Sequence, residues 1–163
     1  MSRAISNTSP LTNLAAIGQF DLLHRLYGAL WIAEAVWEEL NAGGHAWPGC
    51  AEVAKAVWIT RRAVVNRPLV TTLRERLDPG EAETIALAVE CHPAWVLMDE
   101  REGRHTAQRL GIKTVGVVGV LITAKARGLI PKVGPLLEQL RQKAGFFLSD
   151  RVIHDARAFC GEA

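Results

Sequence analysis

Cysteine is scarce in this sequence, and no two cysteines are close together. Cys50, Cys91 and Cys160 are widely spaced, without a Cys-x-x-Cys pair. This argues against a disulfide framework and a structural zinc site, and it fits a reducing compartment. The five histidines are scattered and no two have a short metal-ligand spacing, so we expect no zinc.

Long apolar runs are also missing. The longest uncharged apolar stretch covers residues 114–124, is interrupted by Gly116 and Gly119, and is about half as long as a bilayer requires. The first seven residues contain no apolar signal-peptide core. We therefore expect no membrane partner and a cytoplasmic location.

The composition is that of an ordinary folded protein. With 163 residues, 49% hydrophobic and 22% charged, the chain has the size and balance of a single domain over residues 1–163. The net charge of +2 is small but unevenly distributed, because six acids and no Lys or Arg fall in residues 77–100, between basic stretches at 55–76 and 101–113. Such a pattern indicates either solvated faces or a cation-binding pocket rimmed by charges that attract phosphates.

Apolar segments that alternate with helical patterns predict an α/β fold. Strands are expected at 3–6, 29–32, 57–59, 64–65, 95–98 and 113–115, with Arg67-Pro68 as a break. Helices are expected at 20–26, 33–41, about 79–92, 102–110, 117–127, 132–143 and 149–159, and one more begins with Ser9 as its N-cap and Pro10 at its first position. Because the strands are apolar throughout, they favour a parallel sheet covered on both faces.

Four residues are candidates for a site at the carboxyl ends of these strands, where such sheets bind ligands. Asn7 and Asp99 follow strands, Glu39 lies in the helix after the second strand, and Glu81 opens the helix before the Asp99 strand. Carboxylates gathered in one place require a cation or protonation, and oxygen ligands favour Mg²⁺ or Mn²⁺. Each residue also has a structural alternative: Glu81 and Asp99 as helix caps, Glu39 as a solvated acid, and Asn7 as a strand-closing turn residue.

An ordered set of motifs resembles a known family. The motifs are Ser-Asn-Thr-Ser-Pro-Leu at 6–11, Ala-Val-Trp-Glu-Glu-Leu at 35–40, Leu-Asp-Pro-Gly-Glu-Ala-Glu at 77–83, Leu-Met-Asp-Glu at 97–100 and Gly-Leu-Ile-Pro at 128–131. Together they resemble PIN-domain proteins over about residues 4–150. More closely, they are similar to a prokaryotic PIN-like branch of nucleic-acid-binding proteins related to VapC-type toxins.

The resemblance implies a three-layer α/β/α sandwich with a central parallel sheet and a metal-dependent ribonuclease acting on single-stranded RNA. The implied metal ligands, for Mg²⁺ or Mn²⁺, are Asn7, Glu39, Glu81 and Asp99, with the three acids as catalytic residues and Glu83 as a second register for Glu81. Thr8 or Ser9 would lie beside the site, and Ser9, Arg101 and Arg104 would contact RNA. The implied partners are RNA, the antitoxin of a toxin–antitoxin pair, and a second copy of the chain.

Asn7 departs from the family pattern, in which an acid ends the first strand. Its amide oxygen can bind a cation, but it carries no charge, and its NH₂ group is a donor. Two interpretations stay open. The protein is a nuclease that works with three carboxylates, or a catalytically weakened module that binds RNA or a partner protein.

Overall fold

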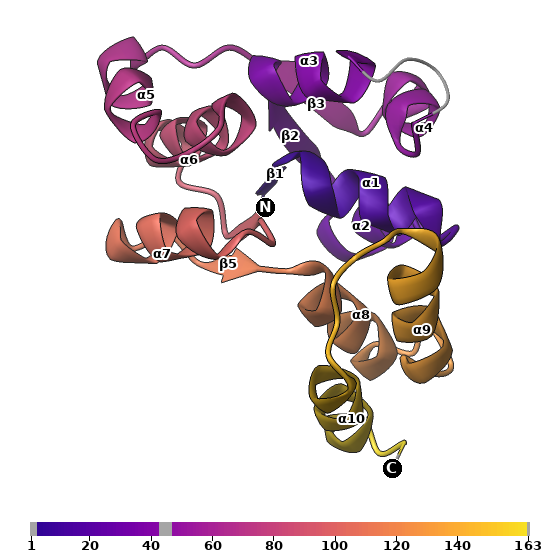
Figure 1. Cartoon of the computed structure of the whole chain (residues 1–163). Helices are drawn as coiled ribbons and strands as arrows, with labels where there is room; N and C mark the ends of the chain where they lie inside the picture. The colour runs from indigo at the N-terminus through magenta and orange to yellow at the C-terminus, as the bar shows by residue number, and fades with distance from the viewer. Residues whose placement is uncertain (1–2, 43–46, 163) are drawn as a thin grey trace.

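A five-stranded parallel sheet forms the centre of the computed structural model, which describes residues 3–42 and 47–162. The strand order is β3-β2-β1-β4-β5, so that the first strand in the sequence is the central one (Figure 1). The strands are β1 Ala4–Ser6, β2 Leu30–Ala33, β3 Ile59–Arg62, β4 Trp95–Leu97 and β5 Thr114–Val115. All are short, and β1 is buried over its whole length.

Helices connect the strands and follow them to the C-terminus. In the described residues they are α1 Thr8–Ala16, α2 Asp21–Tyr27, α3 Glu34–Ala42, α4 Cys50–Lys55, α5 Arg67–Leu73, α6 Pro79–Cys91, α7 Arg101–Arg109, α8 Val117–Ala126, α9 Gly134–Lys143 and α10 Asp150–Phe159. Helix α6 packs against α3, α5 and α7, while α1 packs with α8 and α9, and α2 packs with α8 (Figure 1). The expected three-layer α/β/α arrangement with a central parallel sheet is confirmed.

One hydrophobic core joins the layers. It includes Ile5 of the central strand, Leu97 of β4, Ile85 of α6 and Leu121 of α8, all without exposed surface. Burial of this kind supplies most of the free energy that offsets the ordering of the backbone. In the part of the chain that the structure describes, no helix has the length and apolar character to cross a membrane.

The start of the first helix was predicted wrongly. The helix begins at Thr8, with Asn7 as the N-cap, so Ser9 and Pro10 lie within its first turn, where the missing proline N–H is no loss. Arg67-Pro68 does lie beyond the last strand residue of this region, Arg62. It also opens a helix that was not predicted, α5, whose N-cap Asn66 accepts a hydrogen bond from the Leu69 N–H at 3.1 Å.

The strand predictions around residue 60 also needed correction. A single strand, β3, replaces the two short strands expected at 57–59 and 64–65, and it pairs with β2 at the sheet edge. Its last three residues, Thr60, Arg61 and Arg62, are exposed. The strand was not predicted at these positions, because they are polar, and an edge strand need not be apolar.

Candidate functional site

The strand order reverses between β1 and β4. The chain runs from β1 outward to β2 and β3, then crosses back to β4 on the other side of β1. Ligands bind at such a reversal in open parallel sheets. Ser6 of β1 pairs with Leu97 of β4, so Asn7 and the residues that follow Leu97 meet at this point.

Asn7 is held at this reversal by both backbone and side chain. Its N–H donates to the Leu97 carbonyl at 3.1 Å, and its side-chain Nδ2 donates to Oε2 of Glu100 at 2.9 Å. The residue is only 2% exposed. Its side-chain oxygen Oδ1 is buried and has no hydrogen-bond partner among the described residues, which is rare for a buried polar atom.

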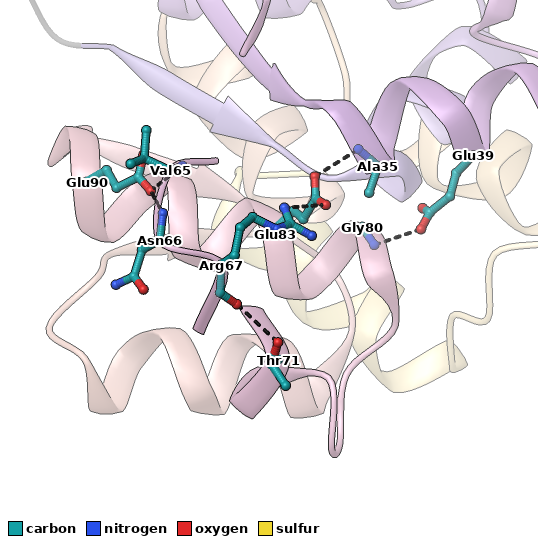
Figure 2. Close-up of polar contacts among 9 residues, drawn as sticks. All are labelled: Ala35, Glu39, Val65, Asn66, Arg67, Thr71, Gly80, Glu83 and Glu90. Carbon is teal, nitrogen blue, oxygen red and sulfur yellow. Dashed lines mark hydrogen bonds and ion pairs between the residues drawn. The ribbon is translucent and has the colours of Figure 1, made fainter. Parts of the chain in front are cut away.

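Glu39 reaches the site from α3, which packs against α6. Its carboxylate accepts hydrogen bonds from the Gly80 N–H at 2.7 Å and from the Thr8 hydroxyl; Figure 2 shows the first of these. A Cβ atom at residue 80 would overlap the Glu39 carboxylate, so any other residue there would displace this carboxylate from its present position. Burial raises the pKa of Glu39, and the hydrogen bond from Thr8 opposes that rise.

Glu81 does cap its own helix. The Asp78 side chain accepts from the Glu81 N–H at 2.8 Å, and Glu81 Oε1 accepts from the Asp78 N–H at 3.1 Å, which completes a capping box. The second oxygen, Oε2, lies against α7, where a Cβ at Gly103 would approach it to 3.0 Å. Burial, with repulsion from Asp78 and Glu100, raises the pKa of Glu81 to about 7.

Asp99 joins the start of α1 to the start of α8. Its two oxygens accept from the Val117 N–H at 2.7 Å and from the Ser9 hydroxyl at 3.1 Å. It is not the cap of the helix that follows it, because Glu100 is the N-cap of α7. Burial raises the pKa of Asp99, although the hydrogen bonds from Val117 and Ser9 act in the opposite direction.

Glu83, the second register considered for Glu81, has a structural role. Its carboxylate accepts from the Ala35 N–H at the start of α3 and from the Arg67 guanidinium, both at 3.0 Å (Figure 2). An acid at a helix N-terminus stabilises that helix through its backbone dipole. Glu83 therefore ties together α3, α5 and α6, and its hydrogen bonds do not involve the residues around Asn7.

A basic pocket adjoins Asp99. It has a volume of about 340 Å³ and is lined by Asp99, Arg101, Arg104, His105 and Gln108, so four of its five residues come from α7. The positive charge of Arg104 acts on Asp99, whose pKa it lowers. Arg101 and Arg104 thus lie where they could contact a phosphate placed next to Asp99. Ser9, the third residue expected to contact RNA, donates its hydroxyl to Asp99 instead.

Glu100 is the site residue that the sequence reasoning missed. Its negative charge raises the pKa of Glu39, Glu81 and Asp99. Glu100 therefore interacts electrostatically with all three carboxyls. The only signal in the sequence was its position directly after Asp99, which is equally typical of an ordinary helix start.

The carboxylate and amide oxygens of these residues are the ligands that Mg²⁺ and Mn²⁺ prefer, and Oδ1 of Asn7 has no hydrogen-bond donor in the described residues. The spacing of the side chains, in contrast, does not suit a bound ion. In residues 3–42 and 47–162, no three His, Cys, Asp or Glu side chains are grouped closely enough to hold a metal ion. The predicted ligands are therefore not arranged around one ion position in this conformation. Glu39 and Asp99 instead accept hydrogen bonds from neighbouring groups.

Comparison with known proteins agrees with this picture. The model of the DUF3368 family, described as a PIN domain, matches residues 3–162. The chain is similar in structure to a PilT N-terminus domain protein, SSO1118, from the archaeon Sulfolobus solfataricus P2, with 16% sequence identity and a TM-score of 0.58 over 75% of this chain and 92% of that one. None of the curated proteins matches the chain.

Proposed function

Because this chain belongs to the PIN domain family, a family of nuclease-type modules that generally use divalent metal ions, we propose that it is a Mg²⁺- or Mn²⁺-dependent ribonuclease. The proposed substrate is single-stranded RNA, whose phosphodiester bonds are hydrolysed. The observation that supports this most directly is the meeting of Asn7, Asp99 and Glu100 at the reversal of strand order, with Glu39 and Glu81 beside them.

The residues that would hold the ion are Glu39, Glu81 and Asp99, with the Asn7 Oδ1 as a neutral ligand. A divalent ion bound there supplies Lewis acidity, which activates water and neutralises charge on a phosphodiester. The raised pKa values of the three carboxyls mean that they hold protons more readily than ordinary acids. Near pH 7, to which the pKa of Glu81 is raised, cation binding should therefore release protons from this carboxyl.

The substrate would approach through the pocket beside Asp99. Arg101 and Arg104 offer guanidinium groups that hydrogen-bond and neutralise phosphates. Arg61 and Arg62 lie at the carboxyl end of β3, on the same edge of the sheet as the acids. Basic groups on two sides of the acid cluster would steer a polyanion toward it and make binding depend on salt.

The test is RNA cleavage by the purified protein with Mn²⁺. Single-stranded RNA should be cut by the parent, and Asp99→Asn should lower the rate by at least 100-fold without changing the fold. Glu102→Gln is the matched control, because Glu102 lies on α7 with an exposed side chain, and this variant should cleave as the parent does. Equal cleavage by Asp99→Asn and the parent would disprove the assigned site.

We further propose that the protein acts in the cytoplasm as the toxin of a toxin–antitoxin pair. The open pocket beside Asp99 is a surface that an antitoxin could cover to keep RNA out. Induced expression in a bacterial host should stop growth, and Asp99→Asn should relieve the arrest. Size-exclusion chromatography tests the second expected partner, another copy of the chain.

A further inference from the structure

The proposed cation site lacks one negative charge where the family pattern has an acid. Asn7 directly follows the central strand, as the N-cap of α1, and contributes only a neutral amide. Glu100 lies 93 positions away in sequence, yet its Oε2 accepts a hydrogen bond from Asn7 Nδ2 at 2.9 Å. The negative charge absent from position 7 is therefore present in the side chain that Asn7 contacts.

The hydrogen bond from Asn7 to Glu100 also orients the amide. Because Nδ2 points at Glu100, the opposite atom, Oδ1, is left as the acceptor that has no partner in the described residues. Asn7 is 2% exposed, so water cannot freely satisfy this oxygen. A buried acceptor without a donor is a ready ligand for a hard cation.

Glu100 also lies next to the segments that carry the other acids. It directly follows Asp99 and is the N-cap of α7, the helix whose Gly103 lies against Oε2 of Glu81. Its hydrogen-bond partner Asn7 adjoins Thr8, whose hydroxyl donates to Glu39. Glu100 thus lies where the segments that carry Asp99, Glu81 and Glu39 come together.

We propose that Asn7 and Glu100 act as one pair that replaces the missing acid, with Asn7 Oδ1 and the second oxygen of Glu100, Oε1, as ligands of the divalent cation. Glu100 supplies the fourth negative charge, and its Oε2 keeps the amide nitrogen of Asn7 turned away from the ion. This inference rests on the proposed function, since it concerns the cation of the same site.

The experiment measures Mn²⁺ binding by isothermal titration calorimetry on the protein without RNA. Glu100→Gln keeps an acceptor for Asn7 Nδ2 and removes only the charge, so Mn²⁺ should bind at least tenfold more weakly. Glu102→Gln, two residues along α7 and exposed, should bind Mn²⁺ as the parent does. Circular dichroism checks that each variant keeps the parent's helix content and melting temperature.

A charge swap makes the test sharper. Asn7→Asp alone sets two carboxylates against each other and should not tighten Mn²⁺ binding. Combined with Glu100→Gln, it moves the charge to position 7 and reverses the hydrogen bond, so the double variant should bind Mn²⁺ within about threefold of the parent. Restored binding supports the pair. A double variant that is folded but as weak as Glu100→Gln overturns it.

The outcomes separate this inference from the proposed function. If Glu100→Gln binds Mn²⁺ as tightly as Glu102→Gln while Asp99→Asn loses binding, the cation site stands and the role of Glu100 is refuted. If Glu100→Gln and the double variant behave as expected and yet no RNA is cleaved, the pair is supported and the ribonuclease proposal fails.

Discussion

The buried carboxyl of Glu81 should make the protein less stable as the pH rises toward neutrality. Burial raises its pKa from 4.5 to about 7, and repulsion from Asp78 and Glu100 adds to the rise. A group with a higher pKa in the folded state binds its proton more tightly there. Its contribution is therefore complete below pH 4.5 and is lost as the pH rises through about 7.

The magnitude follows from this change in pKa. At 1.36 kcal/mol for each pKa unit, the difference between 4.5 and 7 corresponds to at most about 3 kcal/mol. The effective dielectric constant around a partly buried group is higher than that of a dry interior, which lowers this value, so we expect about 1–3 kcal/mol. Glu81→Gln removes the charge but keeps an oxygen that accepts from the Asp78 N–H. The variant should thus match the parent at pH 5 and be more stable by about 1–3 kcal/mol at pH 8.

The assay is urea unfolding followed by tryptophan fluorescence, in buffers at pH 5 and pH 8 that contain a chelator. The parent should lose stability between these values, and Glu81→Gln should lose less. Adding Mn²⁺ at pH 8 should restore the parent more than the variant, because the cation binds the charged site. If the stability difference between parent and variant is the same at both pH values, the argument from burial is refuted.

Three further changes probe other parts of the fold. Gly80→Ala places a Cβ against the Glu39 carboxylate, so RNA cleavage should fall at least tenfold with little change in melting temperature, because the flexible carboxylate moves aside. Glu162 accepts from Lys125 and from two N–H groups at the start of α9; these donors outweigh burial, which alone would raise its pKa, and hold it at about 2. Glu162→Gln should therefore lower the urea midpoint above pH 5, and the difference should vanish as the pH falls toward 2. Leu121→Ala leaves a cavity at a fully buried position and should cost about 2–5 kcal/mol in urea unfolding.

Local features of the fold were readable from the sequence, since they depend on neighbouring residues. The capping box of Asp78 and Glu81 is an example, because a helix start needs an acceptor and an acid three residues apart. The apolar segments at β1, β2 and β4 likewise predicted strands near the observed positions. The start of α1 was misplaced, because a proline near a helix start allows more than one starting residue. Helix α5 was not predicted, because Arg67-Pro68 was interpreted only as a break.

The sequence by itself determined most of the helices, the strands β1, β2 and β4, and the acids that follow them, because capping and apolar patterning act over a few residues. Only the tertiary structure decided which side chains meet. Placing β4 beside β1 brings Glu100 to Asn7, and packing α6 against α3 brings Gly80 to Glu39 and Glu83 to Ala35. The physical reason is that such contacts depend on strand order and helix packing, which are set by the burial of the whole core rather than by any one segment.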